Sequence, residues 1–249
     1  MKNYSLLLLG LVAGFCSASL GIGGGIIIVP ALILLVDYDI KKAVGTSLAT
    51  IVPAALVGIA THSMIRHENI ILLVALFVLI GSVIGVYFGA KLANRISSKI
   101  LTKLFAVLLL FVGLKVTGII NIPVDPVTSN ATYPLLIILG LIAGSASALF
   151  GIGGGIIMVP VFCLFFGLSI HEAIATSLTV IFPTTLAGAI FHKKYDNIST
   201  GAIKYLIPTS LAGAVFGAIF ANNMPSATLK LIFGIFMILA SVRLIIQKK

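Results

Sequence analysis

The sequence predicts an all-α integral membrane protein made of two inverted repeats of about five hydrophobic segments each. Composition is the first observation behind this prediction. Hydrophobic residues fill 60% of the 249 positions and charged residues only 9%, whereas soluble domains carry about 25% charged residues. A bilayer-spanning helix needs about 20 apolar residues, so the chain has material for roughly eight to ten segments and short loops.

An internal repeat is the second observation. Gly10–His62 aligns without gaps to Gly140–His192, with about half of the positions identical. After a two-residue deletion the match resumes, with Gly85–Asn94 corresponding to Gly213–Asn222. Duplicated halves of this kind are typical of secondary transporters. The predicted organisation is an N-terminal transmembrane repeat at 1–120, a linker at 121–132 and a C-terminal transmembrane repeat at 133–249.

Each half contains five apolar segments, and the second of each half is too short for an ordinary span. It either crosses a thinned region or forms half of a re-entrant hairpin. The segments of the first half are 5–20, 24–36, 43–62, 70–92 and 100–120. Those of the second half are 133–148, 154–168, 173–191, 199–221 and 228–246.

The basic residues indicate how these segments are oriented. With five segments per half, all of them except Arg66, Lys115 and Lys230 fall on one side of the membrane. The positive-inside rule places that side, with both termini, in the cytoplasm. An odd number of segments also gives the two halves opposite orientations, so the repeat is expected to be inverted.

A glycine motif occurs once in each half, at Gly21–Gly25 and Gly151–Gly155. Four glycines in five residues break a helix, and broken backbone at membrane depth is tolerated only inside protein or beside a water-filled cavity. Free N–H groups at the start of the following helix favour anions. Close helix packing is the alternative role for these glycines. The candidate binding residues are Gly23, Gly24, Gly25, Gly153, Gly154 and Gly155.

Hydroxyl side chains and prolines follow each glycine motif. Thr46-Ser47 and Thr176-Ser177 precede Pro53 and Pro183, which are expected to kink their helices. The hydroxyls either cap the local backbone or donate to an anion. Two further serines, Ser17 and Ser147, lie four residues before the motifs and carry the same two interpretations more weakly.

The titratable residues exclude several function classes. His62 and His192 end the third segments, where a histidine is either an interfacial residue or a titratable gate or proton site. All six acidic residues fall in predicted loops, which disfavours a cation pump. The sequence has neither metal-ligand spacing nor a nucleophile–base pair, so no cofactor and no enzyme activity are expected. Basic residues at segment ends do not form a nucleic-acid-binding stripe.

The duplicated motifs resemble the sulfite exporter TauE/SafE family. The resemblance rests on the paired Gly-Ile-Gly-Gly-Gly sequences running to Pro30 or Pro160, and on Ala43–Ser47 and Ala173–Ser177. It covers essentially the whole chain. It implies a permease of prokaryotic-type plasma membranes for sulfur-containing anions such as sulfite, thiosulfate or organosulfonates. Members of the family usually have seven to nine spans, which agrees with ten segments if the short second segments are partial.

We therefore expect a secondary anion transporter whose site lies between the two halves. Its partners would be a small anion, the lipid bilayer and a coupling proton or sodium ion. A passive anion channel and a carrier of a non-sulfur organic anion stay open. A membrane-embedded enzyme and a cation transporter are disfavoured by the missing intramembrane acid, base and metal groups.

Overall fold

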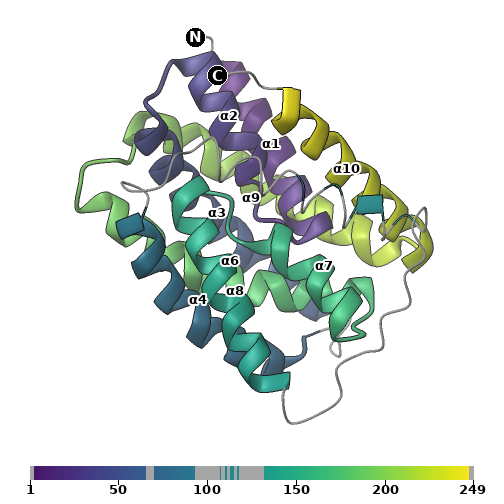
Figure 1. Cartoon of the computed structure of the whole chain (residues 1–249). Helices are drawn as coiled ribbons and strands as arrows, with labels where there is room; N and C mark the ends of the chain where they lie inside the picture. The colour runs from purple at the N-terminus through teal and green to yellow at the C-terminus, as the bar shows by residue number, and fades with distance from the viewer. Residues whose placement is uncertain are drawn as a thin grey trace.

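The computed structural model describes residues 3–65, 70–92 and 132–246, with five single positions at 107, 110, 113, 114 and 117. Regular structure in these residues is helical, with no strand among them (Figure 1). The expected all-α class is confirmed. The helices are α1 (Asn3–Leu20), α2 (Gly25–Val36), α3 (Ile40–Ile65), α4 (Leu72–Leu92), α6 (Thr132–Phe150), α7 (Gly155–Phe165), α8 (Ile170–Lys193), α9 (Thr200–Asn223) and α10 (Ser226–Ile246).

Five of these helices are long and apolar enough to cross a membrane: α3, α4, α6, α8 and α9. By contrast, α2 and α7 contain 12 and 11 residues. At 1.5 Å per residue they span only about 18 Å, well short of a hydrocarbon core of about 30 Å. The short second segments are therefore helices shorter than an ordinary membrane span, and their crossing of a thinned region or folding back as re-entrant segments stays a prediction. The expected segment at 100–120 and the linker at 121–132 lie almost wholly outside the described residues.

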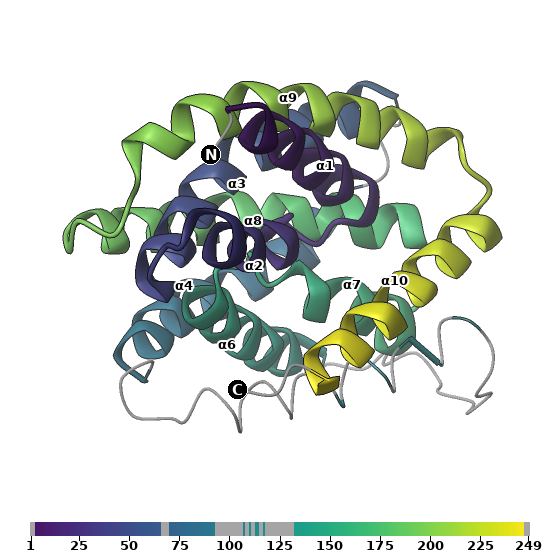
Figure 2. The ribbon, with the colours of Figure 1, turned by 90° about the horizontal axis from the view of Figure 1, so that it is seen from above.

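The two outer layers of the bundle each combine one helix from either half. Seen from above, α1 lies beside α9 and α4 lies beside α6, with α3 and α8 between these pairs (Figure 2). Glycines allow the close approach: a Cβ at Gly14 would collide with the Ser210 carbonyl, and one at Gly144 with the Ser82 carbonyl. The halves are thus interlocked, because each outer pair joins them.

The centre of the molecule is the crossing of α3 and α8, which are equivalent helices of the two halves. A Cβ added at Gly58 would lie 3.2 Å from Leu178, and one at Gly188 would lie 3.0 Å from Leu48. These contacts make the two helices antiparallel. Two equivalent helices that cross in this way are related by an approximate two-fold axis perpendicular to them. The opposite orientation of the halves relative to a bilayer stays a prediction, which this crossing supports.

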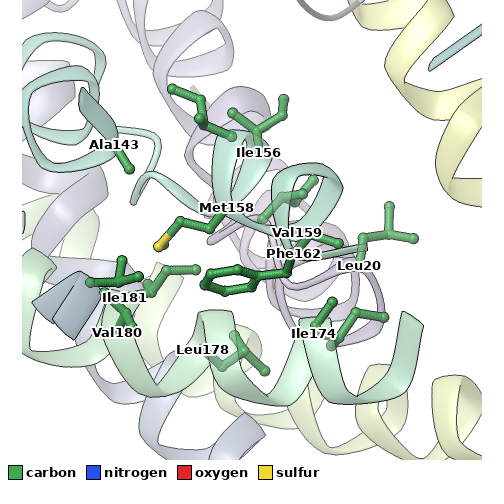
Figure 3. Close-up of a cluster of buried hydrophobic side chains, with 14 of the residues drawn as sticks. Leu20, Ala143, Ile156, Met158, Val159, Phe162, Ile174, Leu178, Val180 and Ile181 are labelled. Carbon is green, nitrogen blue, oxygen red and sulfur yellow. The ribbon is translucent and has the colours of Figure 1, made fainter. Parts of the chain in front are cut away.

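Each short helix is surrounded by its own hydrophobic core. One core contains Met158 and Phe162 of α7, packed against α8 residues such as Leu178 and Ile181 (Figure 3). The other contains Ile28 and Leu32 of α2. The first turns of α2 and α7, which follow the glycine motifs, pack in these cores. The cores therefore fix both motifs near the middle of the bundle.

Candidate functional site

The two glycine motifs form loops of the same conformation. Gly21, Gly23 and Gly24 have φ values of 66°, 84° and 70°, and the equivalent residues of the second loop have 68°, 81° and 80°. Residues with side chains rarely adopt such positive φ values. Glycine is therefore required for the chain to leave α1 or α6, reverse, and start the short helix at Gly25 or Gly155.

The two glycine loops touch each other. A Cβ at Gly23 would lie 3.3 Å from the Cα of Gly153. A Cβ at Gly25 would collide with the carbonyl oxygen of Gly151, and one at Gly155 with the carbonyl oxygen of Gly21. Each loop thus places a carbonyl oxygen against the N-terminal turn of the other half's short helix. That turn has N–H groups without intrahelical partners and carries partial positive charge.

Ser47 and Ser177 hold these carbonyl oxygens in place. The Ser47 hydroxyl donates to the Gly151 carbonyl oxygen at 2.9 Å, and the Ser177 hydroxyl donates to the Gly21 carbonyl oxygen at 2.8 Å. Each bond is buried and runs from one half to the loop of the other. The Ser177 oxygen also lies 2.9 Å from the Ile174 carbonyl oxygen of its own helix. The structure therefore brings the predicted glycines and serines together at one place.

Thr46 and Thr176 point to different partners. The Thr46 hydroxyl accepts a hydrogen bond from the Ser199 amide at 2.9 Å, and the Thr176 hydroxyl accepts one from the Ile71 amide at 3.1 Å. Ser199 caps α9 and Ile71 directly precedes α4. Each threonine therefore anchors the start of an outer helix of the opposite half.

Tyr38 joins the contact at Ser199, and sequence reasoning missed both residues. The Tyr38 hydroxyl lies 2.7 Å from the Ser199 hydroxyl, which also accepts from the Ala202 amide. A signal for Ser199 was present, because serine before an apolar run is a common helix cap. Nothing in the sequence signalled its long-range partners.

The two histidines differ in their surroundings. His62 is fully buried in the protein although it lies near the end of α3. Its Nε2 lies 2.9 Å from the Ala18 carbonyl oxygen and its Nδ1 2.8 Å from the Asn222 amide nitrogen. These partners assign a neutral imidazole protonated at Nε2. His192 is half-buried, and its Nδ1 has no partner within the described part of the chain.

Ser17 and Ser147 occupy equivalent positions on α1 and α6. Each is only 1% exposed, and neither hydroxyl has a hydrogen-bond partner among the residues described. The two prolines, Pro53 and Pro183, lie inside α3 and α8 halfway between the Gly58 and Gly188 contacts. Their expected role in kinking these helices stays a prediction.

Comparison with known proteins agrees with the resemblance of the motifs. The model of the family "Sulfite exporter TauE/SafE" matches residues 1–116 and 136–249. The chain belongs to this family. A probable membrane transporter protein of Bacillus subtilis, YunE, is 29% identical over 99% of this chain and 98% of its own length. A second from that organism, YdhB, is 30% identical over 90% and 91%. A probable membrane transporter protein of Methanocaldococcus jannaschii is 32% identical over 74% and 70%. No solved structure matches the chain.

Membership of the TauE/SafE family makes the chain a membrane permease. In the ranges that the structure describes, no three His, Cys, Asp or Glu side chains form a group suited to a metal. Asp37, Asp39 and Asp196 lie in exposed loops. Glu172 is not in a loop as expected: it forms a capping box with Ser169 in the first turn of α8. The candidate site around the glycine loops therefore consists of neutral hydroxyls, amides and helix ends.

Proposed function

We propose that this TauE/SafE permease is a secondary transporter of small sulfur-containing anions such as sulfite, thiosulfate or organosulfonates. The family's description supports the sulfur class. One observation carries the proposed site: each glycine loop places a carbonyl oxygen against the N-terminal turn of the other half's short helix. These turns are suited to bind oxygen atoms of partial or full negative charge.

In the proposed binding step, the oxygens of the anion replace the two loop carbonyls. The amides around Gly23–Gly25 and Gly153–Gly155 then donate to the anion instead of facing Gly151 and Gly21. Ser47 and Ser177 lose their carbonyl partners when the loops separate, and their hydroxyls become donors to the same anion. In this proposal the anion is bound by neutral, preorganised donors rather than by a positively charged side chain.

Thr46 and Thr176 complete the proposed site by fixing its surroundings. Each holds the start of an outer helix of the opposite half through one amide. The crossing of α3 and α8 at Pro53 and Pro183 is the proposed bending point for alternating access, in which one part of an inverted repeat rocks against the rest.

The proposed setting is the plasma membrane, with both termini cytoplasmic. Five exposed basic residues near the two loops that meet at Tyr38 and Ser199 support this orientation, because basic residues gather on the cytoplasmic side. They are Lys41, Lys42, Lys193, Lys194 and Lys204. Coupling to a proton or sodium ion is part of the proposal, with His62 and His192 as the candidate proton sites.

Thermal unfolding of detergent-solubilised protein tests the site. Sulfite, thiosulfate, methanesulfonate, sulfate, chloride, acetate and sodium would be compared at constant ionic strength. An anion at 100 times its dissociation constant adds about 2.7 kcal/mol of stability. We expect stabilisation by sulfur oxyanions in the native chain and its loss in the Ser47→Ala/Ser177→Ala variant.

The matched control is Thr61→Ala/Thr179→Ala, which removes hydroxyls that bond only to carbonyls of their own helices, α3 and α8. This control should keep the stabilisation. Stabilisation by sodium alone, or by acetate alone, would refute the sulfur-anion assignment. Counterflow in liposomes separates a carrier from the alternative of a passive channel, since only a carrier shows saturable exchange.

A further inference from the structure

We propose that Ser17 and Ser147 are further anion-binding residues, one in each half, whose hydroxyls donate to the same anion. This inference rests on the proposed function and extends its site to α1 and α6. The chemistry to be recognised is a small anion with several oxygen atoms, because each serine would supply one neutral donor to one oxygen.

The burial of these serines is the first observation. Both side chains are 1% exposed and their hydroxyls have no hydrogen-bond partner in the described parts of the chain. Nearly all buried polar groups in proteins are hydrogen-bonded, because an unpaired one costs free energy. Because the two unpaired hydroxyls occupy matching positions of the internal repeat, we infer that both halves use them for the same purpose, the binding of a ligand.

The direction of the hydroxyls is the second observation. A serine within a helix readily donates to the carbonyl four residues before it, and other hydroxyls of this bundle do so. Thr50 bonds to Thr46, and Thr185 bonds to Ile181. For Ser17 the available carbonyl is that of Ala13, yet this bond is not formed. The Ser17 hydroxyl is therefore left without a protein acceptor among the described residues and is available to donate to an anion.

The position of the serines is the third observation, because it places them beside the proposed anion site. The Ala13 carbonyl oxygen would lie 2.6 Å from a Cβ at Gly24, and that of Ala143 would lie 2.8 Å from a Cβ at Gly154. Ser17 and Ser147 are one turn further along the same helix faces. They therefore lie on the faces of α1 and α6 that meet the glycine loops, beside the N-terminal turns of α2 and α7.

Proteoliposome flux of sulfite, thiosulfate and methanesulfonate tests this inference. We expect Ser17→Ala and Ser147→Ala each to raise the half-saturating concentration by about tenfold, as loss of a hydrogen bond to a charged group does. The matched control is Ser210→Ala, since Ser210 has the same 1% exposure but donates to the Ile207 carbonyl of its own helix. This control should transport with an unchanged half-saturating concentration.

Thermal unfolding without any anion separates a binding role from a structural one. Removing an unpaired buried hydroxyl leaves no partner unsatisfied, so the melting temperature of Ser17→Ala/Ser147→Ala should equal or exceed that of the native chain. A lower melting temperature would assign these serines a structural role and overturn the inference. If the double variant keeps the half-saturating concentrations of the native chain, the role of Ser17 and Ser147 is refuted while the proposed function stands. If the native chain transports none of the three anions, the proposed function is refuted as well.

Discussion

The two short helices begin at loops of the same conformation, yet the protein packs them differently. Residues Gly155–Pro160 of α7 are all buried, together with Phe162. In α2 the buried residues are Gly25, Ile28, Val29 and Leu32, which follow a one-sided pattern. The loops are therefore equivalent while the helices behind them are not. Movement of α2 would disturb less packing than movement of α7, so we expect α2 to be the more mobile partner when the loops separate.

The two ends of the bundle also differ in what joins the halves. At one end Tyr38 contacts Ser199 through their hydroxyls. The equivalent residues at the other end are Leu168 and Ile71, whose side chains have no hydroxyl. Thr46 and Thr176 form equivalent bonds at both ends. One end therefore carries an additional polar contact, so the two ends of an approximately symmetric structure are joined unequally.

Substitution of the first residue of either short helix is expected to have the largest effect. In Gly25→Ala and Gly155→Ala the new methyl group meets a backbone carbonyl oxygen of the opposite loop. Backbone cannot move aside as a flexible side chain can, so we expect a loss of about 4 kcal/mol or more in unfolding free energy. Denaturant titration in detergent micelles measures it.

Gly201→Ala is the control for these variants. Its Cβ would meet only the Ser199 hydroxyl, at 4.0 Å, and alanine is the better helix former by about 1 kcal/mol in a helix interior. Stability equal to or slightly above that of the native chain is therefore expected. Wild-type stability in Gly25→Ala or Gly155→Ala would show that the loops are not in contact as described.

Truncation of the equivalent core residues Phe162 and Leu32 tests the difference between the two helices directly. Both are fully buried. Large-to-small changes cost about 3 to 5 kcal/mol for Phe and 2 to 5 kcal/mol for Leu, depending on how far the site can collapse. We expect Phe162→Ala to lose more stability than Leu32→Ala, because its side chain is larger and because Gly155–Pro160 of α7 are all buried, so that the cavity cannot close. Equal losses in the same denaturant titration would contradict the proposed difference in mobility.

Much of this fold could be predicted because its signals are local or repeated. The apolar segments predicted the helices, and the alignment of Gly10–His62 with Gly140–His192 predicted the duplication. The glycine motifs predicted the breaks before α2 and α7, because the positive φ values at these breaks require glycine. The helical class and the short second helices followed from these features alone.

The partners of the site residues could not be predicted, because they depend on contacts between the halves. Ser47 lies 104 residues from Gly151 in sequence, and Ser177 lies 156 from Gly21. The periodicity of a helix does not predict which loop of the other half a hydroxyl will contact. The same holds for His62, which a sequence places near a helix end but which tertiary packing buries against Ala18 and Asn222.

Loss of the Tyr38 hydroxyl should have the smallest effect and the most specific one. Tyr38→Phe removes one partly buried hydrogen bond to Ser199, so we expect a loss of about 1 kcal/mol in unfolding free energy. Because only this end has the contact, the change should favour conformations open at this end. A cysteine placed at exposed Thr200 should then react faster with a membrane-impermeant maleimide in Tyr38→Phe than in the native background. Leu168→Ala with the same cysteine at position 200 is the control, because it changes the other end. Faster labelling in this variant as well would show that labelling does not depend on the Tyr38–Ser199 contact.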